Sequence, residues 1–114
     1  MQVRQETRGG QLILAPGDSL MCGGRAEQFE SVLQEVIAAG HRHVIVDLSS
    51  VGHIDSGGVR VLVSGHLTVN TQGGRVSLAN LCPTVRRVFS TLRLDTVFPV
   101  YDSIDAALAD VAGV

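Results

Sequence analysis

Short apolar blocks alternate with polar segments along the chain, and their spacing predicts an alternation of strands and helices. Near the N-terminus, residues 3–7 and 11–15 predict two strands, and Arg8, Gly9 and Gly10 between them suit a tight turn. We therefore expect the fold to begin with an antiparallel hairpin.

Three later stretches carry apolar residues at helical spacing and have recognisable ends. The first spans 26–39 and stops at Gly40, which suits a left-handed cap; another begins at Pro83, and Asp102 or Ser103 caps the last. The side chains expected to face the core are Phe29, Val32, Leu33, Val36 and Ile37 in the first, Val85, Val88, Phe89 and Leu92 in the next, and Ile104, Leu108 and Val111 in the last.

A further helix is predicted after the β-branched run 44–48, which is typical of a strand covered on both faces, and it closes at Gly73 and Gly74. Its expected core side consists of Val59, Leu62, Val63, His66, Leu67 and Asn70. Its expected outward side consists of Arg60, Val61, Ser64, Gly65, Thr68 and Val69. The outward side is mildly apolar and would be able to dock on a partner.

Two more strands complete the pattern, at 75–79 and at 97–101, where Pro99 suits an edge position. The order β-β-α-β-α-β-α-β-α predicts right-handed crossovers. We expect one α/β domain over residues 1–114. Its sheet should be mostly parallel, with four or five strands and an antiparallel N-terminal edge, and about four helices should flank it.

Composition narrows the function by exclusion. Of the 114 residues, 45% are hydrophobic and 18% charged, Trp is absent, and the net charge is -2. This balance favours a globular domain and gives no electrostatic case for binding nucleic acid or an anionic membrane. There is no signal-peptide pattern and no long apolar run, so a cytoplasmic location is expected, with Cys22 and Cys82 reduced.

The chain turns from the strand at 44–48 into the next helix through a segment ending Asp55-Ser56-Gly57-Gly58. In α/β folds the carboxyl ends of strands are where sites form. In the plainer interpretation, Asp55 or Ser56 simply caps the helix. Helix capping does not account for the two glycines, which would expose backbone amides and leave room for a close approach.

This segment and its surroundings resemble a STAS domain, the fold of bacterial anti-sigma-factor antagonists and of the cytoplasmic tails of sulfate transporters. The similarity covers about residues 3–112. Its parts are HVIVDL (43–48), VGHIDSGGVRVLV (51–63), GGRVSLANLCPTVRRVF (73–89), LRLDTVF (92–98) and SIDAAL (103–108). The second of these is similar to the family's apolar-Asp-Ser-(Ser/Thr)-Gly-apolar signature. This chain departs from the family in having Gly57 in place of the second hydroxyl residue and in its segment 17–25.

The resemblance implies a function. Ser56 corresponds to the family's phosphoacceptor, and the implied partner is an anti-sigma factor of the serine-kinase type, which the unmodified protein sequesters and the phosphorylated protein releases. The expected partner-binding residues are Asp55, Ser56, Gly57, Gly58, Arg60, Val61 and Ser64. Phosphorylation would add negative charge beside Asp55 and disfavour binding without unfolding the domain.

Other functions stay open as alternatives. One is a STAS interaction, scaffold or transport accessory module that is not phosphorylated, and another is a small nucleotide-binding protein that uses the turn at 55–58. No enzyme activity, cofactor or metal is expected. His41 and His43 lack a third ligand at a recognisable spacing, and the G-x-S-x-G pattern of hydrolases is absent around Ser56.

Overall fold

The computed structural model describes residues 3–17 and 25–112, with the side chains at 111 and 112 left undescribed. Cys22, most of the segment 17–25 and the side chain of Val111 therefore lie outside the described residues. The chain forms a five-stranded sheet in the order β1-β2-β3-β4-β5. Its strands are β1 (Val3–Arg8), β2 (Gln11–Pro16), β3 (His43–Asp47), β4 (Arg75–Ala79) and β5 (Val100–Tyr101).

The sheet has the predicted mixture of directions. β1 pairs antiparallel with β2, and the following pairs are parallel. Gly9 and Gly10 occupy the turn with φ of 56° and 81°, a region that glycine enters at little cost, so the hairpin closes between Arg8 and Gln11. The predicted α/β class and the antiparallel N-terminal edge are confirmed.

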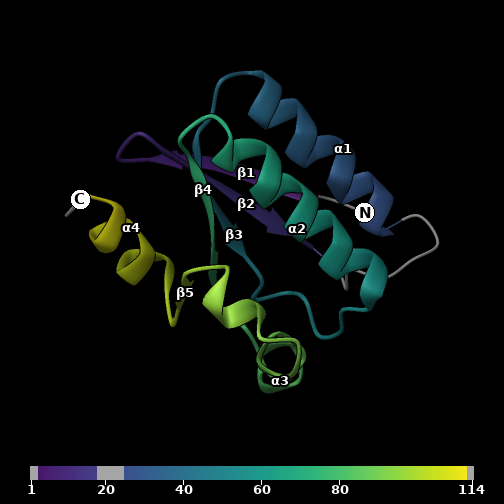
Figure 1. Cartoon of the computed structure of the whole chain (residues 1–114). Coiled ribbons are helices and arrows are strands. Elements are labelled where there is room, and N and C mark those ends of the chain that lie inside the picture. The colour runs from purple at the N-terminus through teal and green to yellow at the C-terminus, as the bar shows by residue number, and fades with distance from the viewer. Residues whose placement is uncertain (1–2, 18–24, 113–114) are drawn as a thin grey trace.

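Two helices, α1 (Arg25–Ala38) and α2 (Ser56–Asn70), lie side by side over one face of the sheet (Figure 1). This face holds the main core, where Phe29 and Leu33 of α1 meet Leu62 of α2 and the inward side chains of the strands. The helix α3 (Pro83–Thr91) adds Val85 and Phe89 to the same core. The predicted inward residues of α1 are confirmed as buried or partly buried.

The helix α4 (Ile104–Ala112) packs against a separate, smaller cluster formed by Ile13, Ile45, Ala79 and Ala107. Residues alternate between the two faces of a strand, so Ile13 and Ile45 point away from the main core. Ser103 caps α4 through its hydroxyl, which accepts a hydrogen bond from the Ala106 N–H at 3.0 Å. Of the two predicted caps, Ser103 is therefore the one that is used.

Two solvent-exposed ion pairs lie between α4 and the strands at the rim of this smaller core. Asp105 lies 3.4 Å from the Arg8 guanidinium, and Asp110 lies 3.7 Å from that of Arg75. The Tyr101 hydroxyl donates a hydrogen bond to Asp110. Burial, and then this hydrogen bond, raise the pKa of Tyr101 above its usual value.

The last strand is shorter than predicted. In place of a strand over 97–101, a 3₁₀ turn (Leu94–Thr96) comes first and only Val100 and Tyr101 pair with β4. Pro99 lacks a backbone N–H, although its carbonyl still accepts from Leu78 at 2.9 Å. Leu92 was expected in the core, but it ends α3 with 54% of its surface exposed.

The structure also corrects the orientation of α2. Val61 and Val69, expected on the outward side, are 1% and 0% exposed, and Gly65 is buried as well. Leu67 and Asn70, expected on the core side, are exposed. The contact with α1 explains the error, because a Cβ on Gly65 would overlap the Leu33 side chain. Gly65 lets α1 approach closely there and turns that side of α2 inward.

Candidate functional site

The helix α2 begins with a capping arrangement that leaves Ser56 exposed. Asp55 is the cap residue, and its Oδ1 accepts hydrogen bonds from the backbone N–H of Gly57 at 2.9 Å and of Gly58 at 3.2 Å. Ser56 is the first residue of the helix and its side chain reaches solvent. Asp55 therefore satisfies two donors that a helix start otherwise leaves unpaired, and the Ser56 hydroxyl is not needed as the cap.

A buried carboxylate holds the loop that carries this helix start. Asp47, at the end of β3, is 4% exposed, and its Oδ1 accepts from the Ser49 backbone N–H at 3.0 Å and from the Asn80 side-chain amide at 3.1 Å. Arg4 of β1 lies 3.7 Å from Oδ2. Buried carboxylates are stable only when charge or hydrogen bonds compensate for the lost water. Asp47 thus ties β1, β4 and the loop together at the carboxyl end of the sheet.

Asn80 reaches Asp47 from a strained backbone position. Its φ of 60° lies in the left-handed region, where asparagine is among the few side chains tolerated. The sequence pattern did not single out Asp47 or Asn80 as part of the site. The one available signal was an acidic residue directly after a β-branched run, in a strand predicted to be covered on both faces.

A groove of about 520 Å³ runs from Ser56 along the exposed side of α2. Its most exposed apolar members are Leu67, 58% exposed, and Leu92, 54% exposed, which comes from the end of α3. The lining residues are Ser56, Val59, Arg60, Val63, Ser64, Leu67, Thr68 and Leu92. An exposed apolar strip bordered by hydroxyl groups is typical of a surface that binds another protein.

The residues predicted to bind a partner separate into two groups. Ser56, Arg60 and Ser64 line the groove together, whereas Gly57, Gly58 and Val61 are buried. Asp55 lies between the two groups as the half-buried cap. Leu67 and Leu92 also line the groove, although the helical spacing of apolar residues predicts both in the core.

Arg60 connects α2 to α1 at the edge of the groove. Its guanidinium lies 3.3 Å from the Glu30 carboxylate, and the side chains are 58% and 31% exposed. An ion pair with this exposure is screened by solvent and contributes little to stability. Its position directly beside the groove makes it accessible to competing charges.

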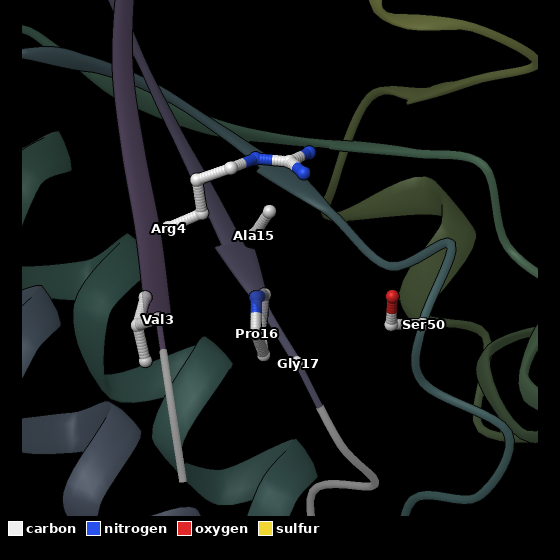
Figure 2. A pocket seen from close by; sticks show the side chains of 6 residues that line it. All are labelled: Val3, Arg4, Ala15, Pro16, Gly17 and Ser50. Carbon is white, nitrogen blue, oxygen red and sulfur yellow. The ribbon is translucent and has the colours of Figure 1, made fainter.

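A second hollow, of about 500 Å³, lies where β1 begins and β2 ends (Figure 2). Arg4 extends across it toward the loop after β3, and Ser50 stands on the opposite side. Val3, Ala15, Pro16 and Gly17 complete the lining. Because Arg4 also faces Asp47, this hollow belongs to the framework that supports the loop.

Within 3–17 and 25–112, no three His, Cys, Asp or Glu side chains gather closely enough to hold a metal ion. The helices in that part of the chain are too short or too polar to cross a lipid bilayer. Cys82 is a free thiol and its Sγ lies 3.6 Å from the Val51 carbonyl oxygen.

Comparison with known proteins gives consistent matches. The STAS domain family matches residues 2–107. A protein of Bordetella bronchiseptica, provisionally named anti-sigma factor antagonist BtrV, is 32% identical over 98 residues, which is 86% of this chain and 84% of the relative. A provisionally named anti-sigma factor antagonist of Thermotoga neapolitana is 34% identical over 82 residues, 72% of this chain and 73% of its own.

A solved structure supports the same relationship. The crystal structure of a protein from Thermotoga maritima, described provisionally as an anti-sigma factor antagonist, superposes with a TM-score of 0.91 at 28% identity. The superposition covers 96% of this chain and 94% of that one.

Proposed function

The chain belongs to the STAS domain family, and on that premise we propose that it is an anti-sigma factor antagonist whose binding is switched by phosphorylation of Ser56. The observation that carries the proposal is the position of Ser56, which is exposed at the first turn of α2 and lines the apolar groove. A modification at this hydroxyl directly changes the surface that a partner would contact.

The unmodified protein offers a largely neutral surface. The apolar side chains Val63, Leu67 and Leu92 would be covered by the partner, and Ser64 and Thr68 would supply hydrogen bonds. Burying exposed leucine surface favours association in proportion to the area removed from water. The partner-binding surface we propose is therefore Ser56, Arg60, Val63, Ser64, Leu67, Thr68 and Leu92, and the buried Val61 is no longer part of it.

The partner would be an anti-sigma factor that is itself a serine kinase. It would transfer the γ-phosphoryl group of a nucleoside triphosphate to the Ser56 oxygen. A bond forms between that oxygen and phosphorus, the bond to the leaving diphosphate breaks, and the hydroxyl proton passes to a base on the kinase. The product carries roughly two extra negative charges at the end of the groove.

Asp55 increases the effect of the phosphate charge on partner binding. Its carboxylate already occupies the amides of Gly57 and Gly58 and cannot move away without uncapping the helix. Two unit charges about 6 Å apart at an effective dielectric constant of about 20 repel each other by about 3 kcal/mol. A partner that covers this region would exclude water from both charges. The phosphorylated protein would therefore dissociate from the partner while its fold stays intact.

The test is a binding titration against the kinase-type anti-sigma factor, with mass spectrometry of the product. Ser56→Ala should bind like wild type and take up no phosphate. Ser56→Asp should fold but bind at least tenfold more weakly, whereas Ser90→Asp, an exposed position on α3, should bind normally. Phosphate on another residue, or tight binding by Ser56→Asp, would favour an unphosphorylated scaffold.

A further inference from the structure

We propose that Arg60 receives the phosphate on Ser56, and that it gives up its ion pair with Glu30 to do so. The inference rests on the proposed function, since it concerns the phosphorylated form. The phosphorylation of Ser56 would then also move the Arg60 side chain, so a change at the start of α2 would alter the charge on α1.

Spacing along the helix is the first argument. Ser56 and Arg60 stand four residues apart, so they lie on the same side of α2 with about 6 Å between their Cβ atoms. Both line the same groove. An acidic group that precedes a basic one by four residues is also the favourable order in a helix.

Two of the backbone amides at the helix start are already engaged, so fewer of them can bind the phosphate. Anions at a helix N-terminus bind the unpaired backbone N–H groups of the first turn. Here the Gly57 and Gly58 amides already donate to Asp55, at 2.9 and 3.2 Å. Among the described residues that line the groove, Arg60 is the one with a positive charge.

The present partner of Arg60 is weakly held. A single guanidinium nitrogen approaches one Glu30 oxygen at 3.3 Å, and both side chains are in contact with solvent. A phosphate offers up to two negative charges and three acceptor oxygens, and arginine can bind two of them at once. The exchange of Glu30 for the phosphate is therefore favourable in charge and in geometry.

The consequence reaches beyond Ser56. When Arg60 turns to the phosphate, the Glu30 carboxylate on α1 loses its counter-charge. Arg60 then neutralises part of the phosphate charge at the start of α2 and no longer neutralises the Glu30 carboxylate on α1. A partner spanning both helices would meet altered charge at two places instead of one.

The experiment uses the full chain with phosphoserine inserted at position 56 during translation, so no kinase is needed. A phosphorus NMR titration measures the second pKa of the phosphate, ordinarily about 6. Arg60→Gln should raise this pKa by a few tenths of a unit above that of the Arg60-containing protein. Arg60→Lys should give a value in between, because it keeps the charge but loses the two-pronged contact.

The matched control is Arg42→Gln, which removes the same charge from an exposed position before β3, at the opposite end of that strand from the loop to Ser56. It should leave the phosphate pKa unchanged. Glu30→Gln should lower the phosphate pKa in both backgrounds, because it removes a nearby negative charge. The decrease should be larger when Arg60 is present than in Arg60→Gln, because loss of Glu30 also frees Arg60 to bind the phosphate. Equal effects in both backgrounds would show that Arg60 and Glu30 do not exchange partners.

The Glu30 side-chain carboxyl carbon resonance gives an independent readout. On phosphorylation it should move toward its position in unphosphorylated Arg60→Gln. If Arg60→Gln and Arg42→Gln give the same phosphate pKa, the inference is wrong. The proposed function would fail separately, through absence of phosphate transfer by the kinase or through tight binding by Ser56→Asp.

Discussion

Both sides of α2 carry large apolar residues, but these residues serve different purposes in the fold. One side, with Val61, Leu62 and Val69, is buried against α1 and the sheet. The other, with Val63 and Leu67, borders an open groove. Hydrophobic residues on a helix therefore do not by themselves indicate which side stabilises the domain and which side is available to a partner.

The largest expected effect comes from truncating the inward side. Leu62→Ala should lower the free energy of unfolding by about 2–5 kcal/mol, because Leu62 is fully buried and its loss leaves a cavity. Urea denaturation followed by circular dichroism measures the change. Leu67→Ala removes the same atoms from the groove side and should change stability by no more than about 0.5 kcal/mol. Similar losses in both variants would abolish the distinction between the two sides.

A second pair of variants tests the corrected orientation at neighbouring positions. Val61→Ala should cost about 2 kcal/mol, because it removes two buried methyl groups worth about 0.8 kcal/mol each and leaves a small cavity. Val63→Ala should cost about half as much, since Val63 is only partly buried. Thermal denaturation of the two proteins under identical conditions provides the comparison, and the reverse order would place Val61 on the outward side after all.

A third test concerns Gly65, which lies at the contact between α1 and α2. Gly65→Ala should destabilise by about 1 kcal/mol, because the overlap with Leu33 outweighs the gain in helix propensity. In a Leu33→Ala background the added methyl group would have space, so the same substitution should be neutral or stabilising. A double-mutant cycle in urea measures this coupling. Additive effects would show that Leu33 does not limit the approach.

The smallest effect on stability should accompany a large effect on binding. Leu67→Ser should leave the unfolding free energy within about 0.5 kcal/mol of wild type, since Leu67 is already exposed. Its affinity for the anti-sigma factor should fall at least tenfold, as measured by calorimetry. Thr71→Ser, an exposed change just past the end of α2, serves as the control and should bind normally. Unchanged affinity in Leu67→Ser would remove the groove from the proposed binding surface.

Much of the fold could be predicted because local signals agreed with one another. Gly9 and Gly10 indicated the hairpin, Gly40 and Pro83 indicated helix ends, and the structure places each where predicted. A helix start at Asp55 or Ser56 was also predicted, since both residue types are preferred N-caps and apolar residues at helical spacing follow them. These features depend on backbone geometry within a few residues of each signal.

The errors arose where a local pattern allowed more than one answer. Val61, Val63, Leu67 and Val69 flank the central apolar stripe of α2 on both sides, so periodicity permitted two orientations that differ by a fraction of a turn. Leu92 fitted a helical stripe but came at the end of α3, where none of the described helices and strands covers it. The role of Asp47 depended on Asn80, thirty-three residues later in the chain, and on Arg4 across the sheet.

The order of the elements, the hairpin and a helix start at Asp55 or Ser56 follow from the sequence alone. Each of these follows from the backbone preferences and capping chemistry of adjacent residues. Only the tertiary structure decided which side of α2 is buried, which leucines form the groove, and that Arg60 meets Glu30. The burial of α2 depends on how closely α1 and α2 approach where Gly65 lies against Leu33, and the groove also needs Leu92 from the end of α3. No local sequence pattern reveals these contacts, because their residues lie far apart along the chain.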